Sequence, residues 1–289
     1  MYDIEQIEPK YSAKDIDDFS NEEQLLEATV ELLKQTIELI YICTGLRYCD
    51  SDGNSRQVTR DEAIIGGNLV RLIKLNTSLL QNICELKSEI AFIICRCIAE
   101  TSINIKYMLT EGEERVKRNY IKYSLITEKD IWNTLKENAQ KRNGDTLPIE
   151  ERMKMSIENS FEKSDFDLDD VKNSSKWKSI ASRAEKVASP DFYDIFYGTS
   201  SHMIHGNWQD ILFNHTRRKN GDFFLNFEWV RPRPQIMDAP IALNLDIVKV
   251  FVEKELVGQN ESELILNKCQ LLATYHQDLV DRHEKIMVK

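Results

Sequence analysis

The residues from Ile90 to Ile105 form the most apolar stretch of the chain and constrain its fold more than any other segment. Their sequence is IAFIICRCIAETSINI, in which the only charged residues are Arg96 and Glu100. Side chains four positions apart lie on one face of an α-helix, so these two are neighbours. A helix that is apolar on almost every side is normally buried, and an unpaired buried charge is costly. The stretch therefore predicts a buried helix with an Arg96–Glu100 ion pair, and this pair locates a candidate site.

Hydrophobic periodicity predicts helices along most of the remaining chain. The sequence contains 10 Gly and 6 Pro in 289 residues, so it has few residues that interrupt helices. Capping boxes at Ser20–Glu23 and Thr59–Glu62 begin two amphipathic helices, Gly112 ends the apolar one, and Pro148 begins another. Further helices are predicted at about 113–141, 177–187, 243–256 and 262–287.

One short region has the character of β-structure. Two apolar runs, ILFNHT and FFLNFEWV, flank RRKNGD, whose Asn-Gly pair is typical of a hairpin turn. The sequence therefore predicts an all-α fold, a multi-helix bundle with a small β-hairpin insertion near 211–230. Residues 1–19 are expected to be a loosely ordered lead-in to a single helical domain, 20–289, with 240–289 as a candidate C-terminal helical subdomain.

Charge and composition narrow the class of protein. A net charge of −10 excludes a protein that coats nucleic acid non-specifically, since such a protein would be basic overall. The N-terminus resembles no secretory signal and no apolar run is long enough to span a membrane, so we expect a cytoplasmic protein whose six cysteines are reduced. Two basic clusters could still contact RNA phosphates, although charged runs are usually solvated surface: Arg115, Lys117, Arg118 and Lys122; and Arg217, Arg218 and Lys219.

A second polar stripe follows Pro190, where Tyr197, Ser201 and His205 are spaced by four residues on a helix with apolar neighbours. We expect this buried stripe to meet Arg96 and Glu100, since buried polar side chains need hydrogen-bond partners. His205 is then the candidate for proton transfer, because imidazole exchanges protons near neutral pH. Ser201 as a nucleophile would need His205 to reach its hydroxyl, which helical spacing makes awkward. The alternative is a buried polar network that keeps the helices in register. No motif for a metal or a cofactor is present, so none is expected.

These motifs resemble an uncharacterised bacterial helical family, catalogued as domain of unknown function 5677. The resemblance covers roughly residues 88–207. It is carried by Arg96-x3-Glu100, Tyr107, RVKRNYIKY, Trp177, the Ala-Glu pair at 184–185 and Tyr197-x3-Ser201-x3-His205-Gly206. The family implies no activity. The helical toxin and phage-defence ribonucleases of the HEPN group are similar in residue types only, because no Arg here has a His at the spacing of their motif.

Two functions follow as hypotheses. In the first, the protein is a metal-independent RNA phosphodiesterase of the toxin or phage-defence type. His205 would be its general acid or base, Arg96 would stabilise phosphate charge, Glu100 would orient the pair, and Tyr197 and Ser201 would position them. In the second, it is a non-enzymatic sensor or partner-binding module whose polar cluster is structural. A homodimer is expected in either case.

Overall fold

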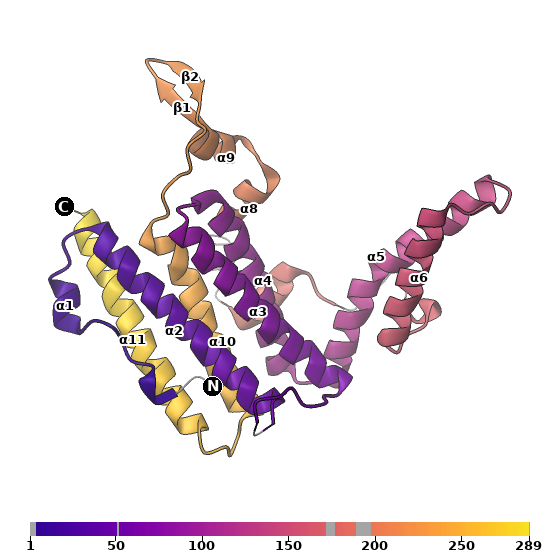
Figure 1. Cartoon of the computed structure of the whole chain (residues 1–289), viewed down its shortest axis with the longest axis horizontal. Coiled ribbons are helices and arrows are strands. Elements are labelled where there is room, and N and C mark those ends of the chain that lie inside the picture. The colour runs from indigo at the N-terminus through magenta and orange to yellow at the C-terminus, as the bar shows by residue number, and fades with distance from the viewer. Residues whose placement is uncertain (1–3, 51, 172–176, 189–197, 289) are drawn as a thin grey trace.

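The chain forms a bundle in which α2, α3, α4, α10 and α11 lie side by side (Figure 1). The computed structural model describes residues 4–50, 52–171, 177–188 and 198–288. The described α-helices are α1 (Ala13–Asp17), α2 (Glu22–Tyr48), α3 (Arg60–Cys84), α4 (Ser88–Glu111), α5 (Glu114–Lys141), α6 (Pro148–Lys163), α7 (Ile180–Val187), α8 (Gly198–His205), α9 (Trp208–Asp210), α10 (Asp238–Glu255) and α11 (Ser262–Met287). Short 3-10 helices span Ile4–Gln6, Leu168–Asp170 and Pro234–Met237. The predicted all-α fold with one small hairpin is confirmed.

The helix ends follow the local signals of the sequence. The capping box of α3 is present, with the Glu62 carboxylate accepting from the backbone N–H of Thr59 at 2.9 Å. The first predicted box differs, because Asn21 and not Ser20 is the capping residue: its Oδ1 accepts two backbone N–H groups at 3.1 Å each. Gly112 ends α4 in the left-handed conformation, with φ +63°. A left-handed residue lets the last N–H bond back to the helix, and glycine adopts this conformation without strain.

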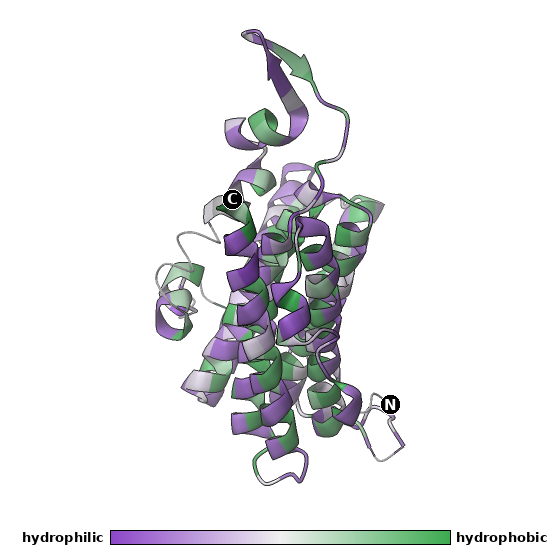
Figure 2. Cartoon of the chain, turned by 90° about the vertical axis from the view of Figure 1, so that its left-hand side faces the viewer, coloured by the Kyte–Doolittle hydropathy of each residue, from purple (hydrophilic) through white to green (hydrophobic). Residues whose placement is uncertain are grey.

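The bundle buries its apolar side chains between the helices, and hydrophilic residues cover the outside (Figure 2). The lead-in contributes Ile7, Ile16 and Phe19 to this core. The central helix α4 contacts α3 on one side and α10 on another. Among the helices in the described part of the chain, none has the length and apolar character that crossing a membrane requires.

Three polar residues inside the bundle form a closed hydrogen-bond network. The side-chain amides of Asn76 on α3 and Asn244 on α10 exchange two hydrogen bonds of 3.0 Å. Asn244 also donates to the Thr36 hydroxyl on α2 at 3.0 Å, and all three residues are fully buried. Since each helix contributes one member, the network specifies how α2, α3 and α10 align.

Two extensions project from the bundle. Helices α5 and α6 form an arm with its own small apolar cluster, which includes Ile121, Leu125 and Phe161 (Figure 1). At one end of the bundle the hairpin projects away from it, with one strand hydrophilic and the other largely hydrophobic (Figures 1 and 2). Its strands are β1 (Thr216–Lys219) and β2 (Asp222–Leu225), paired antiparallel.

The hairpin is confirmed, but its strands are shorter than the apolar runs suggest. Asn220 and Gly221 turn the chain with φ of +54° and +95°, as a two-residue turn of this type requires. The run before β1 is not a strand: Ile211–His215 continues α9 as a π-helical turn. Asp210 accounts for this helical entry, because its carboxylate accepts a hydrogen bond of 2.8 Å from the Asn214 amide one turn later.

Candidate functional site

The predicted ion pair forms on α4. Arg96 Nε lies 3.3 Å from Glu100 Oε1, and the two side chains are 13% and 43% exposed. The Arg96 side chain is therefore largely buried. Glu100 reaches solvent, contrary to the expectation that both members would be buried. Because one end of the pair is open to water, this face of α4 is accessible to a polar ligand.

Helix α8, which carries Ser201 and His205 of the second predicted motif, packs against α4, which carries the first. Ser201 is half-buried, and His205 is exposed at the last position of α8. The expected burial of His205 is thus wrong. Gly206, with φ +55°, ends the helix there, and the chain turns toward the hairpin. Tyr197 lies outside the described residues. One turn before the end of α8, His202 Nδ1 accepts from the Asn207 amide at 2.6 Å.

Helix α7 also packs on α4, and it contributes a buried charge, Arg183, that was not among the residues predicted from the sequence. Arg183 is 6% exposed, and its guanidinium lies 4.4 Å from the centre of the Trp177 ring. Tyr107 from α4 and Tyr120 from α5 contact Trp177 edge-on, with ring centres 5.5 and 5.2 Å away. We call Arg183, Trp177, Tyr107 and Tyr120 the Arg183 cluster. Three helices and Trp177, three residues before α7, thus build it.

The electrostatics of the Arg183 cluster are those of a buried cation. Burial lowers the pKa of Arg183, while the neighbouring Tyr123 and Glu100 act in the opposite direction. Nε and Nη1 of Arg183 are buried and have no hydrogen-bond partner among the residues that the structure describes. Burial also raises the pKa of Tyr107, so its hydroxyl keeps its proton. Glu100 links the two arginines, since it pairs with Arg96 and its charge acts on Arg183.

One sequence signal could have located Arg183. Ile180, Ala184 and Val187 form the apolar stripe of α7, and Arg183 occupies the position of that stripe three residues after Ile180. A charged residue on the apolar stripe of a short amphipathic helix indicates a buried charge, by the same argument that identified Arg96.

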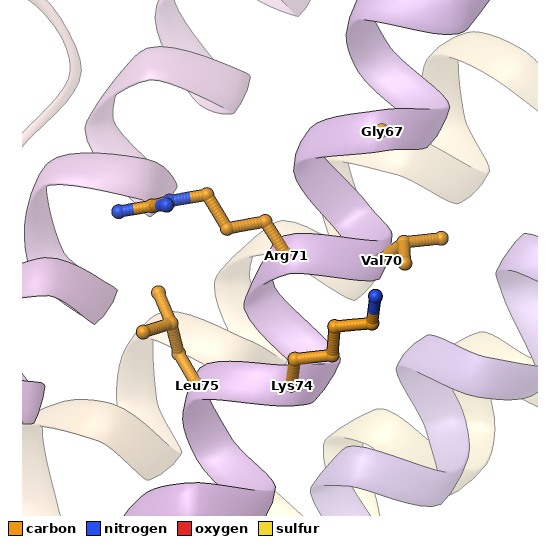
Figure 3. A pocket seen from close by; sticks show the side chains of 5 residues that line it. All are labelled: Gly67, Val70, Arg71, Lys74 and Leu75. Carbon is orange, nitrogen blue, oxygen red and sulfur yellow. The ribbon is translucent and has the colours of Figure 1, made fainter.

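An open pocket lies on α3, beside α4. It is lined by Gly67, Val70, Arg71, Lys74 and Leu75, and Figure 3 shows the Arg71 and Lys74 side chains extending from the helix. Arg71 Nε donates to the Thr101 hydroxyl of α4 at 3.2 Å. Because Thr101 follows Glu100 in the chain, the pocket places two more cations on the neighbouring surface of the bundle.

The two basic clusters predicted from the sequence are partly engaged in contacts within the chain. Arg118 and Lys122 lie over the Phe166 ring at 5.6 and 4.9 Å, and Arg115 pairs with Glu113 at 3.2 Å. Lys117 is half-buried.

In the hairpin cluster, Arg217 pairs with Glu228, and Arg218 lies 5.6 Å from the centre of the Phe223 ring. Lys219 is exposed. Across the described residues, no group of three or more His, Cys, Asp or Glu side chains has a geometry that could hold a metal ion. All six cysteines are free thiols.

The fold and the site define an all-helical protein whose central helix carries a partly buried charged cluster. The family model described as "Family of unknown function (DUF5677)" matches residues 62–223, which is more than half of the chain. The chain belongs to this family. The match includes α4, α5, α7 and α8, which carry the residues of the candidate site, and reaches into the hairpin. Comparison with curated proteins and with solved structures found no match.

Proposed function

We propose that this protein is a metal-independent RNA phosphodiesterase with its active site on the face of α4 that α8 covers. One observation supports the proposal: α8 packs on α4, and both Glu100 on α4 and His205 on α8 have side chains that reach water. A polar network that served only to hold helices in register would be enclosed, as the Thr36, Asn76 and Asn244 network is. The exposure of His205 suits a group that must exchange protons with a substrate and with water.

The proposed reaction is transesterification within the RNA chain. The His205 imidazole takes the proton of a 2′-hydroxyl as its oxygen bonds to the adjacent phosphorus. The bond from phosphorus to the 5′-oxygen of the next nucleotide breaks, and that oxygen takes a proton from the imidazolium or from water. The products are a 2′,3′-cyclic phosphate and a 5′-hydroxyl. Arg96 stabilises the charge that develops on the phosphate oxygens, because donors already in position lower the barrier. Glu100 orients Arg96 and His205, and Tyr197 and Ser201 position these two residues.

The test is cleavage of total cellular RNA in the presence of EDTA by the wild-type protein and by His205→Ala. The matched control is His202→Ala on the same helix, three residues away. We expect the wild type and His202→Ala to cleave at similar rates and His205→Ala to be at least about a hundredfold slower, the usual contribution of a general acid or base. Equal cleavage by all three, or none by the wild type, would contradict the proposal. Circular dichroism of each variant shows whether it is folded.

A second candidate function is a partner-binding module that docks through the hairpin. Several large apolar side chains on and around the hairpin are exposed, and Phe227, just after β2, is 90% exposed. Patches of this kind usually mark a surface that binds another molecule.

If the partner is a second copy of this chain, docking through the hairpin can be tested with the purified protein alone. Light scattering would compare the wild type with a variant in which Phe224 and Phe227 are both serine. A dimer that becomes a monomer in the variant, with an unchanged melting temperature, supports docking through the hairpin. The same mass for both proteins argues against it.

A further inference from the structure

The proposed reaction leaves the most unusual charge of the molecule without a role. Arg183 is only 6% exposed, and two of its guanidinium nitrogens lack a hydrogen-bond partner among the described residues. Buried polar groups in folded proteins are almost always hydrogen-bonded, and a buried charge is normally paired. A buried guanidinium with free donors therefore has the properties of a binding group for an anion.

We propose that the Arg183 cluster binds a phosphate group, with Arg183 as the buried ligand and Arg96 as a second cation on the same side of the bundle. The planar guanidinium presents parallel N–H groups that match two oxygens of a phosphate. The proposed phosphate site does not depend on the proposed RNA activity; only the identity of the molecule that contains the phosphate does. In RNA it would be the scissile phosphate or its neighbour; otherwise it belongs to a free nucleotide or another small phosphorylated molecule.

The aromatic residues of the cluster hold the guanidinium in place without satisfying its donors. The Arg183 guanidinium carbon lies over the Trp177 ring, 4.4 Å from the ring centre. A cation over an aromatic face is attracted by the ring as a whole, and this attraction does not replace the hydrogen bonds that the N–H groups can make to an anion. Tyr107 and Tyr120 contact Trp177 edge-on. The guanidinium is therefore held against a packed ring before any ligand binds.

Stacking on Trp177 does not by itself account for the burial of Arg183. The attraction between a cation and an aromatic ring is smaller than the cost of removing an unpaired ion from water. Glu100, whose negative charge acts on Arg183, is already paired with Arg96 at 3.3 Å. A cluster that retains, at the expense of stability, a cation whose Nε and Nη1 have no hydrogen-bond partner among the described residues is better explained by binding than by folding.

The test compares Arg183→Met with a control, Arg231→Met. Methionine has a similar length without the charge, and Arg231 is an exposed arginine that pairs with Glu23 at 3.1 Å, remote from α7 in the chain. Binding of inorganic phosphate is measured by titration calorimetry, and melting temperature is measured without ligand. We expect Arg183→Met to weaken phosphate binding at least about tenfold and Arg231→Met to leave it within about twofold. We also expect Arg183→Met to melt at the same or a higher temperature, because it removes a buried charge whose cost of burial exceeds the attraction of the Trp177 ring.

Phosphate affinity that is the same in wild type and Arg183→Met, or wild type that binds no phosphate, would overturn the proposal. A lower melting temperature of Arg183→Met with unchanged phosphate affinity would assign the residue to folding alone. Anisotropy of a labelled single-stranded RNA then identifies the carrier. RNA affinity that falls with Arg183→Met supports RNA, and phosphate affinity that falls alone supports a small phosphorylated ligand.

The phosphate site and the RNA cleavage can fail separately. A wild type that binds phosphate through Arg183 but cleaves no RNA would refute the enzyme and leave the site intact. Cleavage that depends on His205, with phosphate binding that does not depend on Arg183, would support the enzyme and refute the phosphate site.

Discussion

Replacing Asn244 with alanine should destabilise the bundle far more than any change at the exposed end of the candidate site. Asn244 is fully buried on α10 and makes hydrogen bonds of 3.0 Å with Asn76 on α3 and with Thr36 on α2. Its removal leaves Asn76 Oδ1 without its donor. Asn76 Nδ2 keeps its bond of 2.9 Å to the Leu72 carbonyl, and the Thr36 hydroxyl keeps its bond of 2.8 Å to the Leu33 carbonyl.

The expected cost follows from this inventory. One buried acceptor left without a donor costs about 1–3 kcal/mol. The two weakened groups and the small cavity add about 1–2 kcal/mol. Asn244→Ala should therefore lower the free energy of unfolding by about 2–5 kcal/mol. His205→Ala should change it by less than about 0.5 kcal/mol, since substitutions at exposed positions have little effect.

Urea denaturation followed by circular dichroism measures both values, and an unchanged slope with urea shows that the variants unfold to comparable states. The double variant Asn76→Ala/Asn244→Ala completes a mutant cycle. It should cost about 1–2 kcal/mol less than the sum of the two single changes, because the second removes the group that the first left unpaired. Costs that add without such coupling, or a loss below about 1 kcal/mol for Asn244→Ala, would refute the reasoning.

Two further predictions concern α3 and its cap. The Arg56 guanidinium and the Thr59 N–H hold the pKa of Glu62 at about 2, well below its usual 4.5. Glu62 therefore contributes stability that is present above about pH 4.5 and lost as the pH falls toward 2. In urea denaturation at pH 7, the free energy of unfolding of the wild type should exceed that of Glu62→Gln by about 1 kcal/mol. The difference should shrink below pH 4.5. A difference that does not change with pH would contradict this. Within the helix, Gly67→Ala should raise stability by up to about 1 kcal/mol, because a Cβ there meets nothing within 4 Å. Gly66→Ala should gain less or lose stability, because its Cβ would lie 3.2 Å from the Tyr48 ring; equal melting temperatures for the two variants would show that the ring moves freely.

The helices and their ends could be predicted from the sequence because they depend on neighbouring residues. The box of Thr59 and Glu62, the left-handed Gly112 and the Asn-Gly turn each act within a few positions of the chain. The Arg96–Glu100 pair belongs to the same class, because spacing along one helix is sufficient to bring the two side chains together. Apolar periodicity in turn specifies which face of each helix is buried, and this was enough to predict an all-α bundle.

The exposure of the candidate site was decided by tertiary structure. The sequence places His205 on an apolar helix, but whether that helix end is covered depends on where the chain goes after Gly206. The structure shows it leaving the bundle toward the hairpin, so His205 is exposed. Arg183 is the opposite case: it is buried because α7 packs on α4 and brings Trp177 against Tyr107, 70 positions earlier in the chain.

By itself, then, the sequence determined most of the helices, the start of α3, the end of α4, the hairpin turn and the ion pair on α4, because hydrogen bonds and steric limits between near neighbours produce them. The tertiary structure alone decided that Asn76 pairs with Asn244, that Trp177 meets Tyr107 beside Arg183 and that the Glu100 side chain reaches water. These features depend on which helix faces meet, and that choice is made by the packing of the whole apolar core. Contacts of this kind leave no spacing in the chain from which they could be read.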